Sequence, residues 1–132
     1  MNTKIVMITS ALVMALTAIM LIFIPRELLS AAGYSDSYIA VLFLQVLGAL
    51  YFAFAVLNWM AKANIIGGIY SKPVAMANYA HFFIAAITLL KTAFQQDVLI
   101  LWIIAIIYAV FAILFAIIAF GNPLKDKTSN EL

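Results

Sequence analysis

Charged residues are scarce in this chain, and their scarcity limits what kind of protein it can be. Of its 132 residues, 9% are Asp, Glu, Lys or Arg, and 68% are hydrophobic. An average soluble domain is about a quarter charged, and a fold this small leaves much of its surface in water. The composition therefore excludes a soluble enzyme and a disordered tail, and it predicts an integral membrane protein.

Cysteine is absent, which excludes a disulfide framework, thiolate metal sites and thiol redox chemistry. A metal site needs three or four ligands from His, Cys, Asp and Glu, and the apolar runs supply only His81. We therefore expect no metal and no cofactor. The net charge is +2 without a basic cluster, so we expect no nucleic-acid partner.

Carboxylates are missing from every long apolar run of the sequence. Proton-coupled transporters usually carry such a group as a relay, and a catalytic histidine needs an orienting partner. The chain offers neither arrangement. The sequence thus favours a protein that is not an enzyme, although His81 could act alone as an acid or base.

Four long apolar runs are what the sequence does contain, and each matches the roughly 20 residues of helix that a bilayer core requires. They cover residues 5–24, 38–60, 74–90 and 98–120. Helices are required because unpaired backbone groups are costly in lipid. We predict an all-α integral membrane four-helix bundle with up-down-up-down topology. It forms a single transmembrane domain over residues 1–132 with a polar tail at 121–132.

A short helix is predicted directly after the first span. Pro25 suits a first helical position, and Gly33 suits the stop. This segment could lie along the membrane surface as an interfacial helix. Ser35, Asp36 or Ser37 can then cap the second span.

The lysines predict an orientation, because cytoplasmic loops of membrane proteins are enriched in Lys and Arg. The side that holds both termini and the middle loop carries five basic residues, and the other side carries two. The five are Lys4, Lys62, Lys72, Lys125 and Lys127, and the two are Arg26 and Lys91. We expect both termini to be cytoplasmic and the location to be the inner (plasma) membrane of a bacterium.

Small residues recur at helical spacing, and such faces allow helices to approach closely in lipid. The sets are Ala11, Ala15 and Ala18; Gly48, Ala49, Ala53 and Ala55; and Ala105, Ala109, Ala112, Ala116 and Ala119. These faces can close a monomeric bundle. They can also pair with a second copy or with a larger membrane complex, so the lipid bilayer, a homodimer and such a complex are the expected partners.

Polar residues inside the spans mark the candidate site, because such groups are costly in a membrane. Asn78, His81 and Thr88 share one face of the third span, which we expect to point into the bundle. Ser10 and Asn58 fall at a similar depth in the cytoplasmic half. The candidate ligand-binding residues are Ser10, Asn58, Lys62, Tyr70, Lys72, Asn78 and His81.

Two interpretations of these residues stay open. In the first they are a structural hydrogen-bonded network, and the protein is a non-enzymatic scaffold, assembly factor or accessory subunit. In the second they line a cytoplasm-facing polar pocket around His81 that holds a lipid headgroup or a small ligand. The protein would then be a small-molecule or lipid-binding protein, such as a transporter or a channel.

Overall fold

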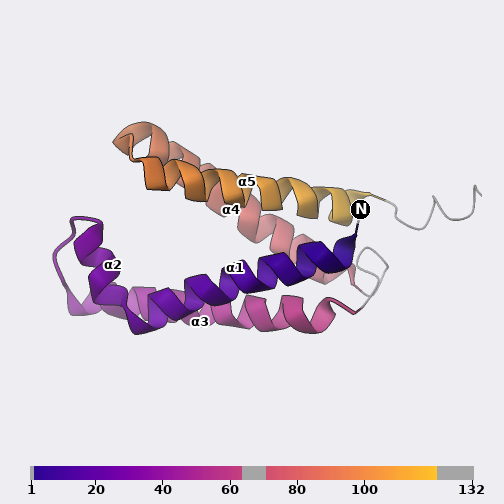
Figure 1. The fold of residues 1–132 in the computed structure, drawn as a ribbon, viewed down its shortest axis with the longest axis horizontal. Coiled ribbons are helices and arrows are strands. Elements are labelled where there is room, and N and C mark those ends of the chain that lie inside the picture. The colour runs from indigo at the N-terminus through magenta and orange to yellow at the C-terminus, as the bar shows by residue number, and fades with distance from the viewer. Residues whose placement is uncertain (1, 64–70, 122–132) are drawn as a thin grey trace, which may run out of the picture. The chain divides into compact units, whose positions relative to one another are not determined.

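The computed structural model describes residues 2–63 and 71–121, and the regular structure of these residues is entirely helical (Figure 1). The helices in chain order are α1 (Thr3–Phe23), α2 (Pro25–Ala31), α3 (Tyr38–Ala61), α4 (Lys72–Gln96) and α5 (Leu99–Phe120). All except α2 are long and apolar enough to cross a membrane. The predicted all-α class, with four candidate spans and a short helix after the first, is confirmed.

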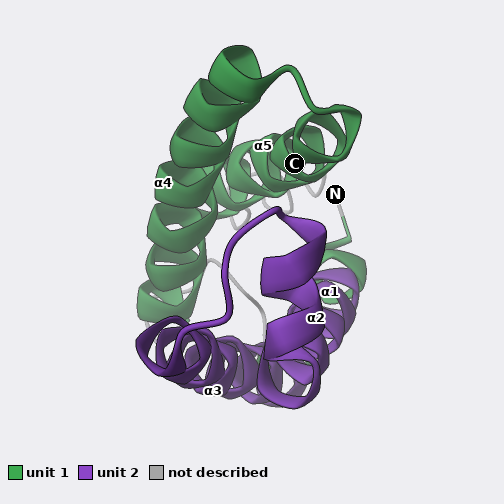
Figure 2. Cartoon of the chain, turned by 90° about the vertical axis from the view of Figure 1, so that its left-hand side faces the viewer, with its two compact units in different colours: residues 1–6, 61–132 green, residues 7–60 purple. Residues whose placement is uncertain are grey.

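The chain divides into two compact units (Figure 2). One unit contains α4 and α5, together with the first residues of the chain. The other unit contains most of α1, all of α2 and nearly all of α3. The single transmembrane domain stays a prediction.

The α4–α5 unit is a tight helical hairpin. Helix α4 continues to Gln96, six residues beyond the predicted end at Leu90, because Lys91 ends the apolar run without breaking the helix. The helix ends at Asp97, which adopts the left-handed conformation with φ of 49° and donates its backbone N–H to Ala93. A connection of two residues, Asp97 and Val98, therefore joins α4 to α5.

Buried residues of this hairpin recur at the spacing of a left-handed helical seam. On α4 they include Ala75, Phe82, Ala86 and Ala93. On α5 they include Ala105, Tyr108, Ala112, Phe115 and Ala119. Within the predicted alanine face of α5, Ala105, Ala112 and Ala119 are buried, and Ala109 and Ala116 are half-buried.

Helices α1 and α3 pair in antiparallel directions in the second unit. Ser10 on α1 bonds to Asn58 on α3, and near the other end Gln45 donates to the carbonyl of Ile22. Gly48 is buried between these two contacts. A Cβ atom at this glycine would lie 3.2 Å from the carbonyl oxygen of Ala18, so the absence of a side chain lets the helices approach.

Helix α2 begins and ends at the predicted residues. Pro25 occupies its first turn and is buried. Gly33 ends it with φ of 77°, donating its N–H to Ser30, while the N–H of Tyr34 bonds to Leu29. This pair of bonds is a Schellman motif, which favours glycine at the left-handed position. Of the three predicted caps of α3, Ser37 is used, and its hydroxyl accepts the N–H of Ala40.

Candidate functional site

The predicted site residues fall into separate parts of the structure. Ser10 and Asn58 belong to the unit with α1 and α3, and Lys62, Lys72, Asn78 and His81 belong to the unit with α4 and α5. Tyr70 lies outside the described residues. Within the predicted set, Ser10 and Asn58 form one group, and Asn78 and His81, one turn apart on α4, form another.

The first group is an interhelical hydrogen bond. The amide nitrogen of Asn58 donates to the hydroxyl oxygen of Ser10 at 3.1 Å and lies 3.7 Å from the sulfur of Met14. The Ser10 hydroxyl in turn donates to the backbone carbonyl of Met7 at 3.0 Å. All four residues are buried, so these polar atoms meet protein partners inside an apolar helix pair. Such an arrangement fixes two helices together.

The second group lies on α4. Asn78 is fully buried, and its amide nitrogen donates to the carbonyl of Val74 at 2.9 Å. His81 is half-buried, with its ring centre 5.2 Å from that of Phe82 and 6.1 Å from that of Tyr108. His81 thus lies against aromatic rings as well as near Asn78, which is one turn away.

The far end of the predicted polar face is exposed. Thr88 is exposed, and its hydroxyl donates to the carbonyl of Ile84 in its own helix at 2.9 Å. A threonine can satisfy its hydroxyl in this way without a partner helix. The two lysines of the set differ in exposure, since Lys62 is half-buried after α3 and Lys72 is exposed at the start of α4.

The described residues contain no group of three or more His, Cys, Asp and Glu side chains that could hold a metal ion. Their buried polar side chains are instead Ser10, Asn58 and Asn78. Each of these three makes hydrogen bonds to helix backbone or to a side chain of the neighbouring helix. Of these bonds, the one between Ser10 and Asn58 joins α1 to α3, and those of Ser10 to Met7 and of Asn78 to Val74 lie within single helices.

The central position of Phe82 in the α4–α5 hairpin was not predicted from the sequence. Phe82 is fully buried and stacks on Phe111 and Phe115, with ring centres 4.8 and 5.6 Å apart. Its edge also meets Tyr108 at 5.3 Å. No sequence signal identified Phe82, because an apolar residue within an apolar run does not differ from its neighbours.

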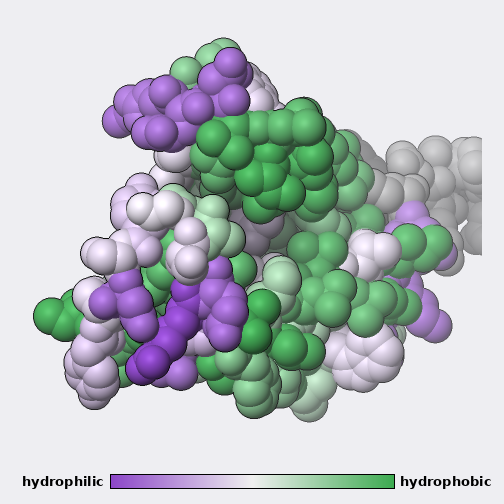
Figure 3. Space-filling view, turned by 60° about the vertical axis from the view of Figure 1, so that its left-hand side comes forward, coloured by the Kyte–Doolittle hydropathy of each residue, from purple (hydrophilic) through white to green (hydrophobic). Residues whose placement is uncertain are grey.

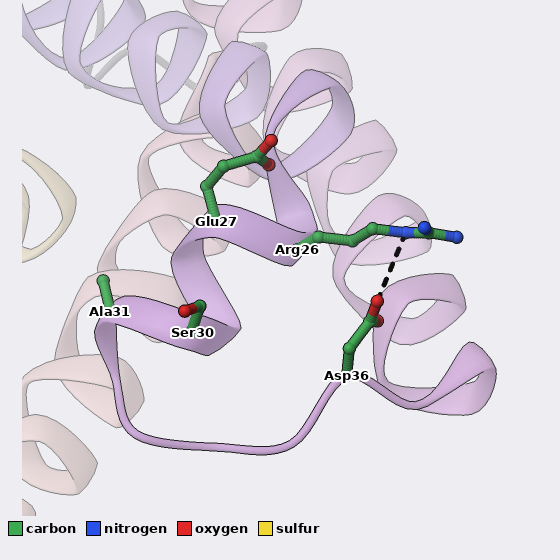
Figure 4. A pocket seen from close by; sticks show the side chains of 5 residues that line it. All are labelled: Arg26, Glu27, Ser30, Ala31 and Asp36. Carbon is green, nitrogen blue, oxygen red and sulfur yellow. Dashed lines mark ion pairs between the residues drawn. The ribbon is translucent and has the colours of Figure 1, made fainter.

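Two surface hollows of the α1–α3 unit were also missed. One, about 500 Å³ in volume, lies beside α2 and is lined by Arg26, Glu27, Ser30, Ala31 and Asp36 (Figure 4). The other is an apolar groove of about 200 Å³ lined by Ala11, Leu12, Ala15, Phe52, Ala55, Val56 and Trp59. The adjacent opposite charges of Arg26 and Glu27, in a chain so poor in charge, were a usable signal for the first hollow.

Comparison with known proteins gave no match to a family model, to a curated protein or to a solved structure. The function is therefore inferred from the sequence and the structure of the chain alone. Four apolar helices are compatible with a small membrane protein.

Proposed function

We propose that the protein is a non-enzymatic membrane protein that works by helix–helix association, as a scaffold or accessory subunit. The observation that supports this proposal is the use of the buried polar groups. Asn58 bonds to Ser10 across the α1–α3 pair, and Ser10 and Asn78 also donate to carbonyls of their own helices, rather than to a common reacting centre.

Helix α3 supplies the surface for association. Its small residues divide between two faces, because Gly48 and Ala55 are buried while Ala49 and Ala53 are exposed. The exposed pair is four residues apart, which is the small-xxx-small spacing that lets transmembrane helices approach closely. The proposed contact is therefore the Ala49–Ala53 face, with either a second copy of the chain or another membrane subunit.

The natural absence of cysteine allows a sharp test by site-specific photocrosslinking. Single cysteines at Ala49 and Ala53 are labelled with a benzophenone maleimide and irradiated in native membranes. Leu47→Cys is the matched control, because Leu47 is exposed on a different face of the same helix. We expect a discrete protein–protein product from the first two positions and none from the third.

The composition of the product identifies the partner. A product of twice the chain mass indicates a homodimer, and a heavier or different mass indicates an accessory subunit of another complex. If all three positions react with lipid only, or if all three crosslink equally, the proposed association face is wrong.

We also propose that both termini lie in the cytoplasm, at the inner membrane of a bacterium. The support is the distribution of basic residues, with five on the side of the termini and two on the other side. In intact cells, a membrane-impermeant maleimide should label Ser35→Cys, in the α2–α3 connection, and should leave Asn2→Cys unlabelled until the cells are opened. The reverse labelling pattern would invert the topology.

A further inference from the structure

The hollow beside α2 gathers charge in a chain that has little of it. Arg26, Glu27 and Asp36 are three of the twelve charged residues in the sequence, and Arg26 is its only arginine. Ser30 adds a hydroxyl to the lining. Figure 3 shows hydrophilic side chains gathered in patches on a surface that is otherwise largely hydrophobic.

The side chains of the hollow have defined positions. The Nε atom of Arg26 lies 3.6 Å from a carboxylate oxygen of Asp36, and the terminal nitrogens of the guanidinium extend beyond this contact (Figure 4). In the same view, the Glu27 side chain points away from the guanidinium. The guanidinium is thus paired with Asp36 alone, and the three charged side chains give the lining a net charge of −1.

The backbone around the hollow is held by specific bonds. The Schellman bonds at Gly33 fix the end of α2, and the Ser37 cap fixes the start of α3. The ion pair between Arg26 and Asp36 then joins the helix to the connecting segment. The backbone bonds hold the segments that carry the charged groups, while the side chains of Arg26 and Asp36 are 71% and 50% exposed and therefore accessible to a ligand.

The hollow lies where a candidate span ends and another begins. Helix α1 ends at Phe23, two residues before α2, and α3 begins at Tyr38. Tyr34 and Tyr38, two residues before and after Asp36 in the sequence, are exposed, as is typical of aromatic residues at the boundary between hydrocarbon and water. Lipid headgroups occupy this depth, so the first ligand available to the hollow is a headgroup.

We propose that this hollow binds a zwitterionic headgroup that carries a phosphate and a primary ammonium, and that the source is an aminophospholipid of the bilayer. The guanidinium of Arg26 suits a phosphate, because its planar donors match phosphate oxygens in pairs. The carboxylates of Glu27 and Asp36 accept hydrogen bonds from an ammonium group, which offers three donors. This inference needs membrane insertion only and is independent of the proposed association face.

The same chemistry predicts selectivity among phospholipids. A choline headgroup has the positive charge, but its trimethylammonium has no N–H to donate to Glu27 or Asp36. A glycerol headgroup leaves the lipid anionic, and the net negative lining of the hollow disfavours it. The expected order is therefore ethanolamine above both choline and glycerol.

The test is native mass spectrometry of the full, delipidated chain in detergent, with phosphatidylethanolamine, phosphatidylcholine and phosphatidylglycerol added separately at equal concentration. We expect the ethanolamine lipid to be retained about tenfold more than either of the others, which corresponds to one or two extra charge-assisted hydrogen bonds. Equal retention of the three lipids would overturn the proposal.

Variants locate the binding. Glu27→Gln should lower retention of the ethanolamine lipid toward that of the choline lipid, with Asp36 still accepting from the ammonium, and Arg26→Gln should lower retention of both. Asp97→Asn removes a carboxylate from the α4–α5 connection and should change nothing. Circular dichroism confirms that each variant is as helical as the parent, and an unchanged preference in a helical Glu27→Gln variant also overturns the proposal.

A soluble arm distinguishes the source of the headgroup. Added O-phosphoethanolamine should not displace the lipid at a concentration equal to that of the lipid, because the acyl chains contribute binding that the free compound lacks. Displacement by an equal concentration of the soluble compound would instead indicate a soluble zwitterion as the ligand and would contradict the lipid source.

Discussion

Asn58 and Ser10 lie 48 residues apart in the sequence and form a side-chain hydrogen bond of 3.1 Å with no exposed surface on either residue. The bond links α3 to α1 close to the ends at which the two helices leave the predicted hydrocarbon region. Removing one partner leaves the other buried and without this bond, so the pair has a measurable energetic signature.

Ser10→Ala should therefore lower the free energy of unfolding by about 1 kcal/mol, in the range known for hydrogen bonds between transmembrane helices. Unfolding is followed by circular dichroism in detergent micelles titrated with sodium dodecyl sulfate. In a double-mutant cycle, the loss of free energy in the variant that carries both Ser10→Ala and Asn58→Leu should be smaller than the sum of the two single losses.

Thr17→Val is the control for this pair, because the Thr17 hydroxyl donates to Val13 in its own helix. We expect its effect to stay below about 0.5 kcal/mol. Strict additivity of Ser10→Ala and Asn58→Leu would show that the bond is not a determinant of stability.

Gly48→Ala should weaken the contact between α1 and α3. The added Cβ would lie 2.7 Å from the Cγ1 atom of Ile22 and 3.0 Å from the Cβ atom of Leu21, so the helices have to separate. We expect a loss of about 2 kcal/mol in the same unfolding titration. Leu47→Ala, at the exposed position before Gly48, should cost less than a quarter as much, and a neutral Gly48→Ala would refute the close approach.

Phe82→Ala should destabilise the α4–α5 hairpin by about 2 kcal/mol, because it leaves a cavity among Phe111, Phe115 and Tyr108. We expect a smaller loss than the same substitution causes in a soluble protein, because a side chain in lipid gains little free energy from leaving water. Phe82→Leu should recover part of the stability. Ile84→Ala, at an exposed position, should cost less than a quarter as much, and equal losses at the two positions would contradict the buried aromatic centre.

Substitutions of Asp97 by glycine and by valine should change the free energy of unfolding in opposite directions. Its left-handed backbone, with φ of 49°, is costly for most residues and free of steric cost for glycine. Asp97→Gly should therefore raise the free energy of unfolding by about 0.5 kcal/mol, and Asp97→Val should lower it by about 1–2 kcal/mol. Two changes of the same sign would show that the turn does not depend on this conformation.

The spans were predictable because a bilayer imposes length and apolarity on any helix that crosses it. Pro25, Gly33 and Ser37 were predictable for a similar reason, since each satisfies a local backbone requirement. The end of α4 was not, because the charge of Lys91 marks the edge of the hydrocarbon and not the end of the helix.

The candidate site was only partly predictable, because helical periodicity gives the depth and the face of a residue but not which helix lies opposite. Ser10 and Asn58 were expected at the same depth, and the structure pairs them. Thr88 was expected on the inward face through its spacing from Asn78, yet it is exposed and bonded within its own helix. The central position of Phe82 was not predictable, because it depends on how the aromatic rings pack and not on a contrast in polarity along the sequence.

The connection between α4 and α5 constrains how the chain is assembled into a membrane. Two residues separate the last turn of one helix from the first turn of the next, so no length of chain is available to hold them apart. If both helices cross the bilayer, they stay adjacent throughout insertion, and we expect them to enter the bilayer together as a helical hairpin.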